Sequence, residues 1–526
     1  MKQNKQNLRM LRSTLAVSIP TLVSRLFGYL RDLLQAFYMG TEKHMDEFAI
    51  AFLIPNLLRR LTAEGAMTAA FIPVFTQYKQ EKKREELWRF ANAFFFDLTL
   101  VMAVVAVLGI LFSPLLVKVI AVGFHSGQSE LTVLLTRIIF PYIFFVSLAA
   151  LIMAILNCFH KFFVPAFTPV LFNLAIISAG LIFAARSREP ALVFAVGVVV
   201  GGALQLAFQI PFVWRKGMRF QPLLSFSHPA VRKVARLMIP GVFGAGIYQI
   251  NMAISRAIAT GLGKGSVSSL YFSSRIQELT LGLFSIALGI ALLPNLSEMA
   301  VKRDFAGMHE TLAFSLKMII LVTFPAAVGL LMLNRPIIRL LFEYGAFDAR
   351  STTMTSSCLI FFAVGLPFVS AVKVLAPAFY SLKDTRTPVI VGAIVTVVYI
   401  GMSLILMHPL QVSGIALALS ISSLFNMSAL FYLLGKKIGR IGKRGLVDAA
   451  LRTSLASAVM AAVVGIFIQA GGLKGTAVST RLAGLAGAVA LGILAYIAGS
   501  LLFNRDDFEV LRNFMRRRSR NKRGDS

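Results

Sequence analysis

Runs of about 20 apolar residues recur along almost the whole chain and are separated by short polar segments. A helix of that length spans the hydrocarbon core of a bilayer, where only helices and closed barrels satisfy their backbone hydrogen bonds. The composition agrees, because 57% of the 526 residues are hydrophobic and only 14% are charged, against about 25% charged in soluble proteins. The sequence therefore predicts an all-α polytopic membrane protein.

About 14 membrane spans are predicted, and Lys and Arg are unequally divided between the two sides. About 35 basic residues fall on the side of the termini and about 11 on the other. Since cytoplasmic loops carry the excess of Lys and Arg, both termini are expected in the cytoplasm. The predicted spans are 15–38, 46–75, 88–112, 131–157, 165–185, 191–214, 231–262, 267–299, 310–333, 353–380, 387–407, 411–435, 447–470 and 480–503.

The net charge of +30 does not indicate nucleic-acid binding, because the basic residues lie in short loops between apolar spans. The basic tail 505–526 is expected to contact lipid headgroups, and a partner-binding tail is the alternative. Neither a Walker A motif nor histidines at metal-ligand spacing are present in the sequence, so neither ATP hydrolysis nor metal catalysis is expected. Cys158 and Cys358 lie in apolar spans and predict no disulfide framework.

An internal repeat divides the chain. The segments 115–132 and 337–354 resemble each other, as do 167–174 and 386–393, at an offset of about 220 residues. Six spans return a chain to the side where it started, so the repeats have the same orientation, as in some secondary transporters. The predicted parts are an N-terminal six-helix lobe (1–220), a C-terminal six-helix lobe (221–440), two extra transmembrane helices (441–504) and the cytoplasmic tail (505–526).

Charged residues inside the first two spans form the candidate functional site. Each charge at mid-membrane is unfavourable by about 2.5–3.5 kcal/mol unless it faces water or a partner. The corresponding spans of the second lobe carry fewer charges, chiefly Arg256, Arg275 and Glu278, so the fold itself does not require them. The candidate site in segment 24–75 consists of Arg25, Arg31, Asp32, Asp46, Arg59, Arg60 and Glu64.

Arginine outnumbers the acidic residues available within these spans. Surplus guanidinium groups in a central cavity favour an anionic ligand, and arginine binds phosphate through two parallel hydrogen bonds. A phosphate-bearing ligand is therefore predicted. The alternative, in which the charges pair across helices and only fix packing, stays open, above all for Asp46 and Glu64. Arg25 and Asp32, seven residues apart, share a helix face. Arg60 with Glu64 and Arg275 with Glu278 are spaced for contact on one face.

The runs SRLFGYLRD (24–32) and DEFAIAFLIPNLLRRLTAEGAMTAAFIPVF (46–75) resemble the N-terminal signature of the MurJ (MviN) family of lipid II flippases. Segment 274–298 also resembles the family pattern, and the resemblance extends over the whole chain. It implies membership of the superfamily of MATE-type exporters. It further implies that the protein flips lipid II, an undecaprenyl-pyrophosphate-linked disaccharide-pentapeptide, across the bacterial cytoplasmic (inner) membrane for peptidoglycan synthesis and cell shape.

The resemblance also assigns roles to residues. It places a hydrophobic groove for the lipid tail at spans 447–470 and 480–503. From the missing motifs, no catalytic residue and no resident metal are expected. Substrate binding is implied for Arg25, Arg31, Arg59, Arg275, Asp32 and Asn173. Cavity charge or gating is implied for Asp46, Arg60, Glu64 and Glu278.

Energy coupling and partners are further expectations. Some family members use a sodium site in the C-terminal half, and Asp384 and Thr396 fall near that region. We expect no cofactor, with a coupling ion (Na⁺ or H⁺) or the membrane potential driving the cycle. The expected partners are lipid II and membrane lipids, with no nucleic acid, for a monomer associated with the cell-wall synthesis machinery. The alternatives are a drug or polysaccharide exporter and a membrane-embedded glycolipid enzyme or scaffold.

Overall fold

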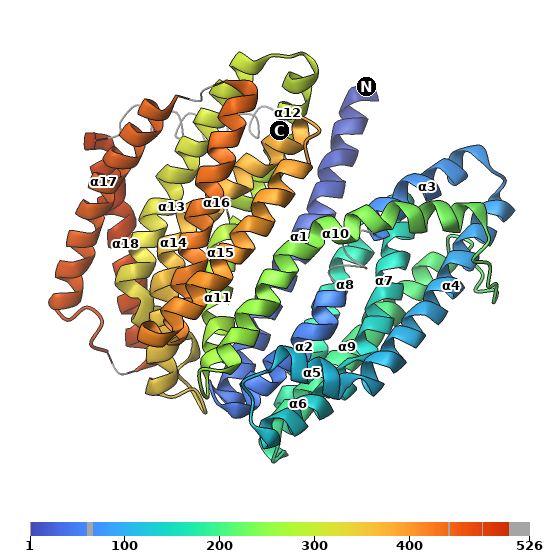
Figure 1. The fold of residues 1–526 in the computed structure, drawn as a ribbon, viewed down its shortest axis with the longest axis horizontal. Helices are drawn as coiled ribbons and strands as arrows, with labels where there is room; N and C mark the ends of the chain where they lie inside the picture. Colours follow the sequence, from blue (N-terminus) through green and yellow to red (C-terminus); the bar gives the residue numbers. More distant parts are fainter. Residues whose placement is uncertain (1, 60–66, 284, 440–441, 476, 504–526) are drawn as a thin grey trace. The chain divides into compact units, whose positions relative to one another are not determined.

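The computed structural model describes residues 2–59, 67–283, 285–439, 442–475 and 477–503. These residues form helices joined by short loops, with no strand among them (Figure 1). The prediction of an all-α chain is confirmed.

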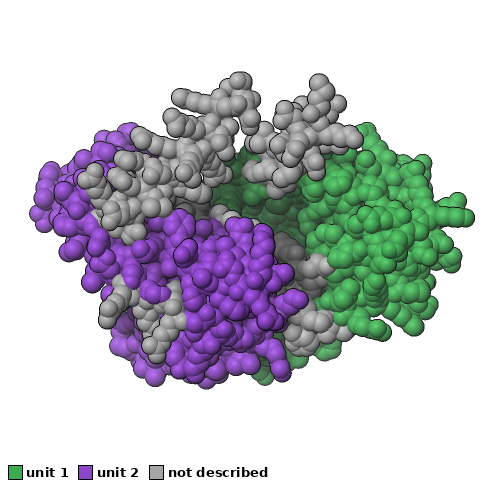
Figure 2. Space-filling model, turned by 90° about the horizontal axis from the view of Figure 1, so that it is seen from above, with its two compact units in different colours: residues 1–268, 344–348 green, residues 269–343, 349–526 purple. Residues whose placement is uncertain are grey.

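The chain divides into two compact units, which Figure 2 distinguishes by colour. Unit 1 comprises residues 1–268 and 344–348, and unit 2 comprises residues 269–343 and 349–526. The predicted lobe boundaries stay predictions. The helices that lie wholly in unit 1 are α1 (Lys2–Met39), α2 (Lys43–Arg59), α3 (Thr68–Glu81), α4 (Arg84–Leu111), α5 (Ser113–Ile120), α6 (Ser126–Ile139), α7 (Pro141–Cys158), α8 (Phe163–Phe183), α9 (Pro190–Trp214) and α10 (Pro229–Thr260), with the short 3₁₀ helix η2 (Ala184–Arg186).

Helix α11 (Ser266–Leu283) begins in unit 1 and continues into unit 2. The other helices of unit 2 are α12 (Ser285–Val301), α13 (Phe305–Phe342), α14 (Ala349–Ser381), α15 (Arg386–Leu410), α16 (Val412–Ile438), α17 (Lys443–Gln469) and α18 (Val478–Phe503).

Corresponding helices of the internal repeat begin at corresponding positions. Helix α4 starts at Arg84 and α13 at Phe305, while α8 starts at Phe163 and α15 at Arg386. Both pairs keep the offset of about 220 residues found in the sequence. One difference is that α6 and α7 are separated at Phe140, before Pro141, whereas the corresponding α14 is continuous. Proline favours the first turn of a new helix, which explains the break.

Ten helices of the described residues are long and apolar enough to cross a membrane. The count of fourteen spans stays a prediction. The four other predicted spans correspond to α1, to α2 with α3, to α10, and to α11 with α12. These segments contain in-span charges and polar residues or consist of two shorter helices. Such composition is tolerated in a membrane where a helix faces protein or a wet cavity rather than lipid.

Aromatic side chains fill the core of unit 1 between α3, α4 and α7. Phe71 stacks on Phe75 and on Phe90, with ring centroids 5.3 and 5.5 Å apart. Trp88 stacks on Phe159 at 5.7 Å, just beyond the end of α7. Interlocked rings fix the approach of neighbouring helices by close packing, which is the main source of helix association in lipid.

Unit 2 has its own core, built on α14. Val374 and Phe379 of α14 are fully buried beside Leu434 of α16 and residues of α12, α13 and α15. A Cβ on Gly365 would overlap with Ser420, so this glycine allows α14 and α16 to approach closely. Helices α17 and α18 pack on α13, where the Tyr496 hydroxyl donates to the Leu321 carbonyl at 2.6 Å.

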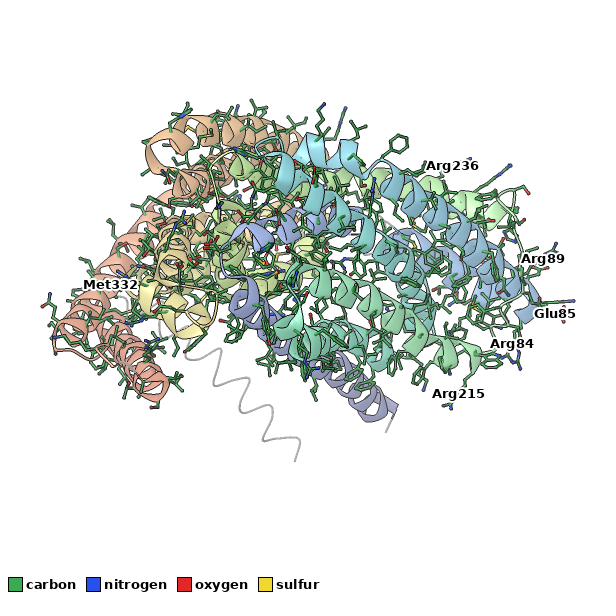
Figure 3. The ribbon with its side chains drawn as sticks, turned by 90° about the horizontal axis from the view of Figure 1, so that it is seen from below. Arg84, Glu85, Arg89, Arg215, Arg236 and Met332 are labelled. Atoms are coloured by element: carbon green, nitrogen blue, oxygen red, sulfur yellow. The ribbon has the colours of Figure 1, made fainter. Side chains whose placement is uncertain are left out.

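Two loops rich in basic residues lie side by side at one end of unit 1. Arg84 Nη2 donates to the Lys216 carbonyl at 3.0 Å, which joins the start of α4, directly after the α3–α4 loop, to the loop after α9. Figure 3 shows Arg84, Arg89, Arg215 and Arg236 at this same end. These contacts agree with the assignment of both loops to one side of the membrane.

Candidate functional site

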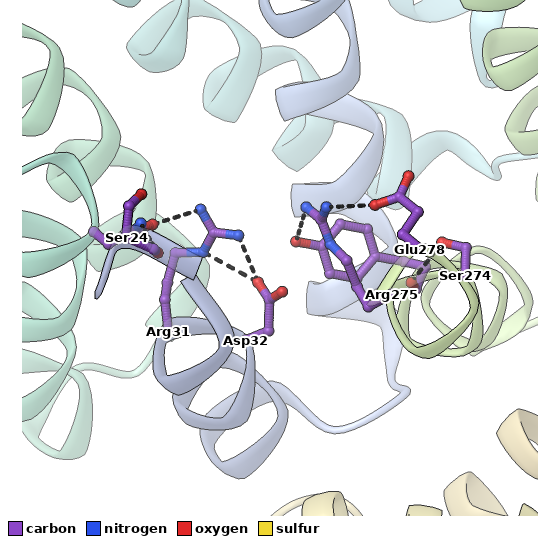
Figure 4. A network of polar contacts seen from close by, with 8 residues as sticks. Ser24, Arg31, Asp32, Ser274, Arg275 and Glu278 are labelled. Atoms are coloured by element: carbon purple, nitrogen blue, oxygen red, sulfur yellow. Dashed lines mark hydrogen bonds and ion pairs between the residues drawn. The ribbon is translucent and has the colours of Figure 1, made fainter. Parts of the chain in front are cut away.

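Arg31 is the centre of a polar network in unit 1. Its Nε and Nη2 donate to Asp32 Oδ1 at 3.1 and 2.7 Å, and its Nη1 donates to Asn173 Oδ1 at 3.0 Å (Figure 4). The side chains of Arg31 and Asp32 are 11% and 5% exposed. Because hydrogen bonds to charged groups strengthen as water is excluded, this network fixes the guanidinium plane.

Asn173 links two helices. Helix α8 packs along α1, and Asn173 Nδ2 donates to the Ser24 carbonyl at 3.2 Å while Oδ1 accepts from Arg31. Gly28 lies beside this amide, and a Cβ there would be 3.5 Å from Nδ2. The structure thus brings Arg31, Asp32 and Asn173 together. Arg25, a further predicted site residue, is exposed on α1.

Arg59 lies in the last turn of α2 and contacts its own helix. Its Nε and Nη2 donate to Asn56 Oδ1 at 3.1 and 2.9 Å, one turn earlier. This contact orients the guanidinium. Arg60 and Glu64, which helical spacing predicts to pair, lie outside the described residues.

Asp46 is buried and binds backbone groups. Its Oδ2 accepts from the N–H of Gly265 and its Oδ1 from the N–H of Ser268, both at 2.7 Å. The carboxylate therefore caps the N-terminus of α11 from α2, where a negative charge also interacts favourably with the helix dipole. Gly265 has φ of +87°, and a Cβ there would overlap with the Thr41 carbonyl. In this structure, the Asp46 carboxylate holds the connection between α10 and α11 in place. These are packing contacts, the alternative that the sequence leaves open beside a role in the transport cavity.

Arg275 and Glu278 form a second network, in unit 2. Arg275 Nη1 donates to Glu278 Oε2 at 3.1 Å, and Nη2 donates to the Tyr271 hydroxyl at 3.1 Å (Figure 4). The guanidinium carbon also lies 4.8 Å from the centroid of the Tyr271 ring. The two charged side chains are 27% and 35% exposed, so the pair is accessible to a ligand or to water.

Tyr271 and Asn56 were missed by the sequence interpretation. Each precedes its arginine by one helical turn, at spacings of four and three residues. That spacing was the available signal, because side chains so placed meet on a helix surface. Arg256 is a further in-span arginine, and its Nη1 donates to the Ala49 carbonyl of α2 at 3.2 Å.

Asp384 and Thr396, which lie near the region of the family's sodium site, have protein partners. Asp384 Oδ2 lies 2.5 Å from both Lys437 Nζ and Thr387 Oγ1. Burial alone would raise the pKa of Asp384, but the hydrogen bonds from Lys437 and Thr387 and the Lys437 charge lower it to about 2. Thr396 Oγ1 donates to Gly392 within its own helix at 2.9 Å. Within the described residues, no group of three or more His, Cys, Asp and Glu side chains is arranged to hold a metal ion.

Comparison with known proteins gives consistent matches. The model of the family described as "Lipid II flippase MurJ" matches residues 35–496. A probable lipid II flippase MurJ of Vibrio cholerae is 35% identical over 94% of this chain and 96% of that protein. A lipid II flippase MurJ of Burkholderia cenocepacia is 35% identical over 82% of this chain and 84% of that protein.

Solved structures give the same result. A lipid II flippase MurJ in an inward closed conformation matches with a TM-score of 0.78 and 27% identity, over 93% of this chain and 99% of that one. An inward-facing multidrug transporter of the MATE family matches with a TM-score of 0.69 and 14% identity, over 82% of this chain and 99% of that one. The second match shows a shared fold alone.

Proposed function

Because the chain belongs to the MurJ family of lipid II flippases, we propose that it moves lipid II from the inner to the outer leaflet of the bacterial cytoplasmic membrane. The protein is a multi-pass membrane transporter, not an enzyme. The observation that best supports a role in binding the headgroup is the guanidinium of Arg31, which is only 11% exposed inside α1 and is oriented by Asp32 and Asn173.

The anionic pyrophosphate of lipid II matches the chemistry of the arginines. In the free protein, Asp32 and Asn173 orient Arg31, while Glu278 and Tyr271 orient Arg275. An oriented guanidinium loses little conformational freedom when it binds phosphate bidentately, so more of the interaction is retained as binding free energy. Arg25 on α1 and Arg59 on α2 add further arginines to unit 1.

We infer that transport proceeds by alternating access with both termini in the cytoplasm. The orientation is supported by the basic loops gathered at one end of unit 1. The membrane potential supplies about 2.3 kcal/mol per elementary charge per 100 mV and acts on the cationic site, on the anionic headgroup or on a coupling ion. The undecaprenyl tail stays in lipid beside α17 and α18, which carry exposed apolar side chains such as Leu451 and Leu494. We further propose that the protein acts as a monomer beside the cell-wall synthesis machinery.

The function is tested in a bacterium whose own lipid II flippase can be depleted. The wild-type gene should restore growth and the exposure of lipid II on the outer leaflet, and Arg31→Ala should restore neither. Arg339→Ala is the matched control, because Arg339 of α13 also pairs with a nearby acid, Glu343, but its side chain is more exposed, at 42%. Normal growth and normal outer-leaflet lipid II in cells that express only Arg31→Ala, at wild-type protein levels, would contradict the proposal.

A further inference from the structure

Glu47, in the first half of α2, is a buried acid that the transport site does not use. Its side chain is 0% exposed, and neither carboxylate oxygen accepts a hydrogen bond from the described residues. Its neighbour Asp46 is equally buried but accepts two backbone N–H groups. An ionised carboxylate without hydrogen bonds is strongly unfavourable away from water, whereas the protonated acid is tolerated.

The charged groups around Glu47 are weakly placed to keep it ionised. Lys43 Nζ is 3.8 Å from Oε1, beyond hydrogen-bond length, and its side chain is 39% exposed. His44 Nδ1 is 3.7 Å from Oε2. Glu189, from the start of α9, adds negative charge, as does Asp46.

His44 connects Glu47 to the surface. The same Nδ1 that faces Glu47 lies 3.0 Å from Glu189 Oε2. The side chains of His44 and Glu189 are 38% and 41% exposed, so both meet solvent. Imidazole gains and loses protons near neutral pH, which suits it to pass a proton between two carboxylates.

We propose that Glu47 is a proton-binding site that fills from the extracytoplasmic solvent through Glu189 and His44. A proton on Glu189 Oε2 transfers to His44 Nδ1, breaking the O–H bond and forming an N–H bond. The imidazolium then turns from Glu189 toward Glu47, closing the gap of 3.7 Å between Nδ1 and Oε2, and transfers this proton to Oε2. Glu47 becomes the neutral acid while His44 returns to its neutral form. The net change is one proton taken from solvent. The direction rests on the proposed function and orientation, in which this end of unit 1, opposite the basic loops in Figure 1, faces outward.

Loss of this proton has a structural consequence. An ionised Glu47 requires water, which the contact between the start of α2 and the start of α9 excludes. Deprotonation should therefore loosen that contact, next to Asp46 and the connection that it anchors. Proton binding at Glu47 would in this way bias α2 toward the packed arrangement.

Infrared difference spectroscopy of the full chain in lipid nanodiscs, without lipid II, tests the site directly. Wild type should show the carbonyl stretch of a protonated carboxylic acid at neutral pH, which disappears on alkaline titration. Glu47→Gln should remove this band, and Glu42→Gln, an exposed acid of the preceding loop, should retain it. A wild-type spectrum without the band, or a band that persists in Glu47→Gln, would overturn the proposal.

The relay has its own test, which is the rate at which the band shifts after transfer to D₂O. His44→Gln should slow this exchange several-fold, whereas His125→Gln, at an exposed position before α6, should not change it. If the rate of the band shift is unchanged in His44→Gln, the proton does not reach Glu47 through His44. Because neither measurement includes substrate, a failure of lipid II transport and a failure of proton binding are distinguishable.

Discussion

Arg31 of α1 and Asn173 of α8, 142 positions apart, meet through a hydrogen bond of 3.0 Å from Nη1 to Oδ1. The other end of the same amide donates to the Ser24 carbonyl. Asn173 thus connects the backbone of α1 to the guanidinium, and Arg31 has a fixed direction before any ligand arrives. This relationship leads to the first prediction.

Replacing Asn173 with Ala should weaken transport while leaving the helices intact. A hydrogen bond to a charged group contributes about 1.5–3 kcal/mol, so we expect lipid II exposure to fall about ten- to hundredfold in rate. The measurement is the rate of lipid II appearance on the outer leaflet. Asn334→Ala is the control, because Asn334 bonds only to the Leu331 carbonyl of its own helix in the described contacts. Equal rates for the two variants would show that the amide does not position Arg31.

Replacing Arg275 with Lys tests geometry separately from charge. The ammonium keeps the positive charge but loses the planar fork that contacts Glu278 and Tyr271. We therefore expect Arg275→Lys to retain partial complementation in a depletion strain and Arg275→Ala to retain none. Arg339→Lys should behave as wild type. Full activity of Arg275→Ala at normal protein levels would rule out a role for this guanidinium in binding.

The sequence predicted the helices and some of the ion pairs, but not the hydrogen bonds between side chains and the backbone. Apolar runs and the offset of about 220 residues predicted the helices, because membrane spans and repeats leave signals in composition and spacing. The pair Arg275–Glu278 followed from helical spacing. The role of Asp46 did not, because its partners are N–H groups 219 and 222 positions away, and every residue type except proline offers such a group. Glu47 was overlooked for a different reason: the sequence does not show that its carboxylate is buried without a hydrogen bond from the described residues.

Asp46→Ala should destabilise the protein more than it changes ligand chemistry. The substitution leaves the buried N–H groups of Gly265 and Ser268 without their acceptor, which costs about 1–3 kcal/mol for each. Asp304→Ala is the control, since Asp304 caps α13 through one exposed bond to Gly307, worth about 0.5–2 kcal/mol. Thermal unfolding of the purified proteins should show a larger loss of stability for Asp46→Ala than for Asp304→Ala. If Asp46→Ala loses no more stability than Asp304→Ala, Asp46 does not anchor the connection.

His228 should make the stability of unit 1 depend on pH. Burial and the nearby positive charge of Arg89 lower the pKa of His228 below its ordinary value of 6.5, against the opposing charges of Asp97 and Glu86. Its Nδ1 accepts from Ala230 N–H at 3.2 Å at the start of α10, which requires an unprotonated nitrogen.

The folded protein therefore binds fewer protons at His228 than the unfolded chain does. It follows that the free energy of unfolding rises with pH, is fully developed above about 6.5, and falls as the pH drops below that value toward the lowered pKa. Thermal midpoints at pH about 7.5 and about 5.5 should differ less in His228→Gln than in wild type. His125→Gln should keep the wild-type difference, and an unchanged difference in His228→Gln would contradict this assignment.

Gly265→Ala should weaken the α10–α11 connection through the backbone. Gly265 has φ of +87°, where a side chain is strained, and a Cβ there would overlap with the Thr41 carbonyl. The Gly265 N–H also donates to Asp46, so any shift that relieves the overlap lengthens a buried hydrogen bond. We expect a lower thermal midpoint and reduced transport in Gly265→Ala. In contrast, Gly401→Ala, in the middle of α15 with nothing within 4 Å of the new Cβ, should be neutral or slightly stabilising. If Gly265→Ala matched Gly401→Ala in stability, the strain at this connection would be too small to matter. The double variant Gly265→Ala/Asp46→Ala should lose less stability than the sum of the two single losses, because both changes disrupt the hydrogen bond from Gly265 N–H to Asp46.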